Sequence, residues 1–99
     1  MPIRTPRDAY RKLKERYPDS ILAFAHGQML EFIATDAHDM QRLVQLEVVR
    51  PHGYDIATIH NTQYFPLKAR LKNMGRDMKL VFRKRTSTDK ISFQVQDDL

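Results

Sequence analysis

Cysteine is absent from the 99-residue sequence, so disulfide bonds and thiolate metal sites are excluded. Long apolar runs are also missing, since none approaches the roughly 20 residues that span a bilayer. The basic N-terminal stretch MPIRTPRDAYRKLKERYP has no apolar core and therefore does not resemble a secretory signal. The composition predicts one compact domain over residues 1–99, with a cytoplasmic location as the default expectation and no membrane association.

The net charge of +5 is unevenly distributed along the chain. Residues 1–16 hold six basic and two acidic residues, and residues 64–96 hold nine basic and two acidic residues. Residues 17–63 are acidic, with two basic and six acidic residues. If the two basic ends meet in the fold, they form one positive surface suited to phosphate groups; otherwise they are ordinary solvated faces.

The pattern of apolar residues predicts a succession of helices and strands. Helices are expected over residues 5–17, from a cap at Thr35 or Asp36 to Val44, and over residues 62–74. Strands are expected over residues 20–25, 29–34, 54–60, 78–82 and 91–95. The connection 46–53 stays unassigned, and residues 83–90, RKRTSTDK, are expected to form a turn. This order, α-β-β-α-β-α-β-β, predicts an α/β or α+β fold in which about three helices pack on a mixed β-sheet of about five strands.

The stretch AFAHGQMLEF, residues 23–32, runs into a turn and out again and contains one carboxylate. Gly27-Gln28 fits a two-residue hairpin turn with glycine at the first central position. Strand alternation then places Met29 and Glu31 on one face of the second strand and their apolar neighbours on the other. Because a buried unpaired carboxylate is costly, we expect Glu31 to leave the core to those neighbours and to look outward beside Met29.

Two longer segments resemble the N-terminal mismatch-recognition domain of MutS-type mismatch repair proteins. YRKLKERYPDSILAFAHGQMLEFIATDA resembles the family's helix, tyrosine-proline-acid turn, apolar strand, G-D-F-Y-E-L-F motif and acid-alanine helix start. YDIATIHNTQYFPLKARLKNMGRDMKLVF is similar to its strand, long A-R-L-bearing helix, glycine stop and closing strand. The resemblance covers residues 8–83 and follows the order of elements as well as the residues.

In that family the phenylalanine of G-D-F-Y-E wedges into the duplex beside a mismatch, and the glutamate hydrogen-bonds the displaced base. By position Met29 replaces the phenylalanine and Glu31 matches the glutamate, so the resemblance implies that both side chains probe bases. Methionine is a departure, because a thioether inserts between base steps but gives up much of the stacking of an aromatic ring. Gln28 is a second departure, since it replaces the acid of the motif.

The sequence lacks parts that a complete mismatch repair protein requires. The P-loop motif G-x-x-x-x-G-K-[ST] is absent, and the sequence contains three glycines in all. We therefore expect that the chain uses no cofactor. We also expect it to be a free-standing or excised recognition domain that lacks the clamp and the ATPase of the complete repair proteins. Such modules are expected in plasmid, phage or conjugation proteins, where other domains of a longer parent protein are further partners.

Basic residues near both ends are the expected phosphate contacts, which position a protein on nucleic acid without reading its sequence. They are Arg7, Arg11, Lys12, Lys14, Lys68, Lys72, Arg83, Lys84 and Arg85. The expected partner is DNA, and duplex DNA ahead of single strands.

Neither a metal site nor a catalytic motif is expected. The four histidines, His26, His38, His52 and His60, contain no pair at the i, i+4 spacing of H-E-x-x-H. The serines lie in no nucleophile motif, and no carboxylate-x-lysine cluster stands out on a predicted strand. We predict a non-enzymatic DNA-binding module that combines electrostatic contacts with a hairpin probe. The alternatives are a protein-binding accessory module that has lost DNA contact, and a small nuclease.

Overall fold

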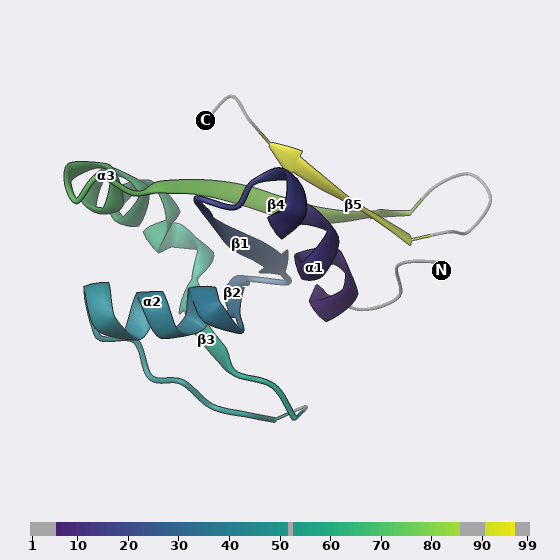
Figure 1. Ribbon diagram of the computed structural model, residues 1–99, viewed down its shortest axis with the longest axis horizontal. Helices are drawn as coiled ribbons and strands as arrows, with labels where there is room; N and C mark the ends of the chain where they lie inside the picture. Colours follow the sequence, from purple (N-terminus) through teal and green to yellow (C-terminus); the bar gives the residue numbers. More distant parts are fainter. Residues whose placement is uncertain (1–5, 52, 86–90, 97–99) are drawn as a thin grey trace.

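The computed structural model describes residues 6–51, 53–85 and 91–96; for Pro6, residues 83–85, residues 91–94 and Gln96 it describes the backbone without the side chain. The elements are α1 (Pro6–Arg16), β1 (Ser20–His26), β2 (Met29–Ile33), α2 (Thr35–Val44), β3 (Ile56–His60), the short 3-10 helix η1 (Asn61–Gln63), α3 (Tyr64–Asn73), β4 (Asp77–Arg85) and β5 (Ile91–Gln96). The predicted order α-β-β-α-β-α-β-β is confirmed in the described part of the chain (Figure 1).

The five described strands form one mixed sheet in the order β3-β2-β1-β4-β5. β1 and β4 run parallel, while the other neighbouring strands are antiparallel. The parallel pair forms because the chain leaves β2, passes through α2, β3 and α3, and then returns to the free edge of β1 as β4. The predicted mixed α+β fold is therefore confirmed.

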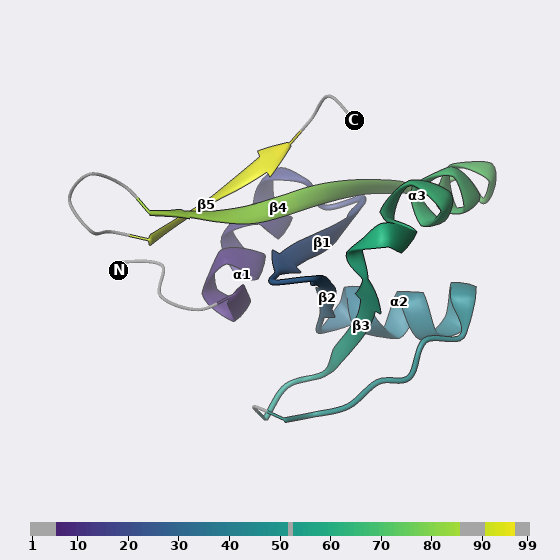
Figure 2. The ribbon, with the colours of Figure 1, turned by 180° about the vertical axis from the view of Figure 1, so that it is seen from behind.

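Two apolar cores lie on opposite faces of the sheet, because successive residues of a strand point to opposite sides. Ile21 and Ala23 of β1 pack in the core with α2 and α3, whereas Leu22 and Phe24 pack in the core with α1. All four are buried, as expected for a continuous apolar strand that is covered on both faces. In Figure 1 α1 lies to the right of β1, whereas α2 and α3 lie to its left, and Figure 2 shows the same arrangement from behind.

A buried ion pair joins α1 to the start of α2. Asp36 is fully buried, and its carboxylate accepts a hydrogen bond from Leu22 N at 3.0 Å and lies 3.0 Å from Lys14 Nζ. The β1–β2 ladder extends only from Phe24 to His26, so Asp36 supplies an acceptor where β2 no longer lies beside β1. Burial raises the pKa of Asp36, and the bonds from Leu22 and Lys14 oppose that rise.

The expectation that Thr35 or Asp36 caps α2 is wrong. The N-cap residue is Ala34, which has φ 56° and ψ −123° and no side-chain hydrogen bond to the helix. Asp36 cannot act as the cap because its carboxylate turns inward to β1 and Lys14, and Thr35 is already the first residue of the helix. The left-handed φ of Ala34 is held by a hydrogen bond from its N–H to Asp55 O at 2.8 Å.

The predicted glycine stop of the third helix is confirmed. Gly75 has φ +79°, and its N–H donates to Lys72 O at 3.0 Å. Arg76 N donates to Leu71 O at 2.9 Å, which completes a Schellman motif. At the other end the helix begins later than expected, because residues 61–63 form η1 and the α-helical part starts at Tyr64, with Pro66 in its first turn.

Two further boundaries, the start of β3 and the end of β4, differ from the sequence-based expectation. β3 begins at Ile56, and in the unassigned connection before it Val49 pairs with Ile56 in a single bridge. β4 continues through Arg85, so three residues of the expected turn 83–90 are strand that pairs with β5. Residues 86–90 and Thr5, the expected cap of the first helix, lie outside the described residues.

Candidate nucleic-acid interface

The β1–β2 hairpin turns at Gly27-Gln28, as expected. His26 pairs with Met29, and the two residues between them form the turn. Gly27 has φ +60°, while Gln28 has no positive φ, which is the pattern of a type II′ turn. This backbone carries the chain directly from the central strand into β2 and fixes which residues of β2 face each side of the sheet.

Met29 and Glu31 point to the same face of the sheet, as strand alternation predicts. Leu30 and Phe32 are buried in the core with α2 and α3, and Ile33 belongs to the core with α1. Met29 therefore lies on the face that carries α1, at the turn end of the strand, with 37% of its surface exposed. Glu31, between Met29 and Ile33 on that face, is half-buried.

Two histidines flank Met29 in the same cross-strand row. Met29 is paired with His26 of β1 on one side and with His60 of β3 on the other. Directly opposite residues have Cβ atoms about 5 Å apart, so both histidines begin close to Met29 on the same face of the sheet. Thr62 N donates to His60 Nδ1 at 3.3 Å, so the neutral ring carries its proton on Nε2, to which no described residue is seen to bond.

Glu31 lies in the next row, between Phe24 of β1 and Thr58 of β3. No described residue forms a hydrogen bond or an ion pair with its carboxylate. Its charge nevertheless reaches Tyr54: burial raises the pKa of Tyr54, Glu31 raises it further, and Arg7 opposes this. The Arg7 guanidinium lies over the Tyr54 ring at 5.7 Å, so the start of α1 borders the same surface as Glu31.

Comparison with known protein families identifies the family of this chain. The family model of MutS domain I matches residues 6–91. The chain belongs to the MutS domain I family. This family is the N-terminal mismatch-recognition domain, and it is a recognition domain rather than a catalytic one. A search of curated proteins finds no match to this chain.

Three basic residues of α1, the helix that covers the Met29 face of this MutS domain I, form no ion pair with the described residues. Arg7, Arg11 and Lys12 are exposed and form no ion pair with any described residue. They belong to the helix whose apolar side, with Ala9 and Tyr10, covers this face of the sheet. Arg16, which sequence analysis did not single out, is exposed on the same helix and lies over the Tyr17 ring at 5.6 Å.

Lys14 is engaged within the protein. Its ammonium group has three protons, and it has three protein partners: Asp36 Oδ1, Ser20 O and Pro18 O. No donor is left for a phosphate group. The periodicity of α1 could not reveal this, because the partner carboxylate lies 22 residues further along the chain.

Lys68 and Lys72 do not share a surface with α1. α3 packs on the opposite face of the sheet, so α1 and α3 do not meet the condition under which the two basic ends would form one positive surface. Lys68 Nζ donates to Met78 O at 2.9 Å and to Tyr64 OH at 3.4 Å, and Lys72 is exposed. The side chains of the remaining candidates, Arg83, Lys84 and Arg85, lie outside the described residues.

Metal binding, membrane-spanning helices and the role of His38 can also be assessed in the described part of the chain. Among the described residues no group of three or more His, Cys, Asp or Glu side chains could hold a metal ion. No described helix is long and apolar enough to cross a membrane. His38 instead pairs with Asp55, whose second oxygen lies 3.2 Å from Arg50 Nε, so this histidine fastens α2 to the loop before β3.

Proposed function

We propose that this MutS domain I binds duplex DNA through the face of the sheet that carries α1, with Met29 and Glu31 at the bases. The supporting observation is that an exposed thioether and a carboxylate without a described partner lie on the face of the sheet that α1 covers, and α1 carries exposed cations that form no ion pair with any described residue. Methionine is among the apolar side chains that insert between base steps. Glu31 supplies an acceptor for a base whose pairing is already disturbed.

Phosphate contacts in this proposal come from Arg7, Arg11 and Lys12. Cations along one face neutralise phosphates without reading sequence, and they fix how the protein lies on the duplex. The Nε2–H of His60 supplies a further donor to a phosphate oxygen beside Met29. Sequence analysis did not connect His26 or His60 with Met29. For His26 the signal was present, because a two-residue hairpin turn places His26 opposite Met29.

Two exposed lysines on opposite faces give a matched test. Lys12 of α1 and Lys72 of α3 form no ion pair with described residues, and each can be changed to glutamate with the same change in net charge. Lys12→Glu should weaken duplex binding on every sequence and flatten the log–log salt dependence by about one unit, since each neutralised phosphate contributes about −0.9. Lys72→Glu should leave that slope unchanged.

The assay is fluorescence anisotropy of a labelled duplex titrated between ~50 and ~200 mM salt. Equal effects of the two substitutions would place the DNA on a different surface. Binding that does not respond to salt would contradict the electrostatic part of the proposal. A preference for mismatched duplexes is tested separately through Met29.

A further inference from the structure

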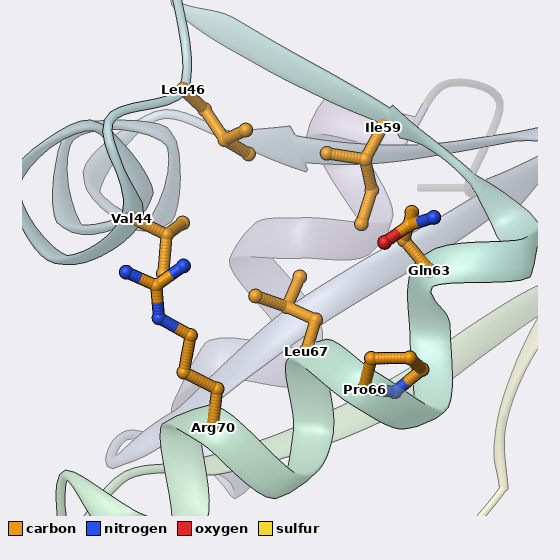
Figure 3. Close-up of a pocket in the computed structure, with 7 residues that line it drawn as sticks. All are labelled: Val44, Leu46, Ile59, Gln63, Pro66, Leu67 and Arg70. Carbon is orange, nitrogen blue, oxygen red and sulfur yellow. The ribbon is translucent and has the colours of Figure 1, made fainter.

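An apolar pocket lies on the face of the sheet opposite to Met29 and Glu31. Its volume is about 210 Å³, and its apolar wall comes from Val44, Leu46, Ile59, Pro66 and Leu67. Figure 3 shows these side chains arranged around one opening between α2, β3 and α3. Cavities of about 150 Å³ accommodate a benzene-sized molecule, so this pocket has room for one large apolar side chain.

The pocket exists because the chain before β3 separates from the edge of the sheet. Val49 and Ile56 exchange two main-chain hydrogen bonds, of 2.9 and 2.8 Å, and no described bridge continues toward Leu46. Leu46 packs instead against the core with α2 and α3, and its side chain lies across the pocket from Ile59 (Figure 3).

The same separation leaves main-chain groups of β3 without partners. Ile56 directs its N–H and C=O away from β2, toward Val49. Residues two apart in a strand direct these groups to the same side, so Thr58 also points them away from β2. No described residue bonds to them. Thr58 therefore presents an open donor and acceptor at the edge of the sheet, next to the pocket that Ile59 lines.

Arg70 adds a charge to this surface. It is exposed on α3, lines the pocket, and forms no ion pair with any described residue. In Figure 3 its guanidinium group lies beside Val44, at the rim of the opening. By contrast, the carboxylate of Asp39 on the neighbouring α2 is already held by Arg42 and Arg76, each at 3.0 Å.

We propose that the pocket and the open edge of β3 form a docking site for an extended segment of another polypeptide. The segment adds to the sheet through main-chain hydrogen bonds at Thr58, which is the mode called β-augmentation. One apolar side chain, on the same face as Ile59, fills the pocket. A carboxylate within a few residues of that side chain pairs with Arg70. A small molecule would satisfy the pocket but not the open main-chain groups, which is why the occupant is a peptide.

This inference does not rest on DNA binding, because the site lies on the other face of the sheet from α1. A random linear peptide library displayed on phage, selected against the full chain and counter-selected against Arg70→Glu, identifies the occupant's chemistry. We expect enriched peptides to combine an apolar residue with a nearby Asp or Glu. Synthetic copies should bind Arg70→Glu at least about tenfold more weakly, since a charge-assisted pair is lost.

Matched variants separate the three parts of the site. Lys72→Glu, the same charge change two residues along α3, should leave peptide affinity unchanged. A peptide whose acid is replaced by lysine should regain affinity for Arg70→Glu. A peptide N-methylated at the residue that faces Thr58 should bind more weakly, and the Thr58 amide should shift in the NMR spectrum on titration.

Several results would overturn the inference. They are the absence of any enriched sequence, enriched peptides without an acid, equal affinity for Arg70→Glu and the parent chain, or amide shifts confined to the face of α1. Concentration-dependent dimerisation that Arg70→Glu abolishes would instead assign the surface to a second copy of the chain.

Discussion

Replacing Lys14 by methionine tests the assignment of this residue to the fold rather than to phosphate. Methionine keeps much of the side-chain volume but leaves the Asp36 carboxylate, whose side chain is 1% exposed, with one hydrogen bond from Leu22 N. Removing one partner of a buried pair costs about 3–5 kcal/mol. A domain of this size has a total stability of about 5–15 kcal/mol, so Lys14→Met should lower the urea midpoint strongly.

The loss of stability in Lys14→Met should be larger at neutral pH than in acid. Burial raises the pKa of Asp36 in the folded protein, so ionised Asp36 opposes folding and its protonation favours it. Loss of Lys14 raises that pKa further, because the bond from Lys14 lowers it in the parent chain. The difference in free energy of unfolding between Lys14→Met and the parent should therefore be largest near neutral pH and should shrink as pH falls toward the pKa of the variant carboxyl.

Urea denaturation followed by circular dichroism, at about pH 7 and about pH 5, measures this difference. The double variant Lys14→Met/Asp36→Asn should be more stable than Lys14→Met, since the asparagine oxygen still accepts from Leu22 N without a buried charge. Lys12→Met, an exposed position on the same helix, should stay within about 0.5 kcal/mol of the parent. A cost for Lys14→Met below about 1 kcal/mol, or one equal at both pH values, would refute the reasoning.

Two further predictions concern the hairpin turn and the ion pair that joins α2 to the connection between α3 and β4. Gly27→Ala should destabilise the protein by about 1–2 kcal/mol in thermal unfolding, because the φ of +60° at this position disfavours any residue with a Cβ; an unchanged melting temperature would contradict the type II′ turn. Arg76→Gln should cost about 1 kcal/mol near neutral pH, where its bond to Asp39 is present. Burial raises the pKa of Asp39, but its bonds to Arg76 and Arg42 lower it on balance, so the Arg76→Gln cost should vanish as pH falls through that lowered pKa; a cost that persists in acid would contradict this.

The hairpin that carries Met29 and Glu31 could be predicted from sequence because local rules decide it. A glycine that needs a positive φ fixes the turn, and strand alternation then fixes which residues face the core. The order of elements followed from periodicity in the same way. These features depend on neighbours in the chain, and the family resemblance covered the same residues.

What the sequence could not provide depends on tertiary placement. The charge pattern does not say which face of the sheet each helix covers, and α1 and α3 cover opposite faces. An aspartate at the start of a helix usually caps it. Here the β1–β2 ladder ends at Phe24, and the Asp36 carboxylate instead accepts a hydrogen bond from Leu22 N. His60 lies beside Met29 because β2 and β3 pair, and these two residues are 31 positions apart in the sequence. No local sequence pattern encodes such a pairing.

The central claim is that Met29 and Glu31 probe bases, and the most direct test is a titration of matched and mismatched duplexes. Unstacking costs a few kcal/mol per step and costs least at a mismatch, so the parent chain should prefer the mismatched duplex. Met29→Ala should abolish that preference and keep the salt-dependent background, whereas Met29→Phe should strengthen it through base stacking. Glu31→Ala should act in the same direction as Met29→Ala and non-additively with it. Equal affinity of the parent chain for both duplexes, with none gained in Met29→Phe, would contradict the claim.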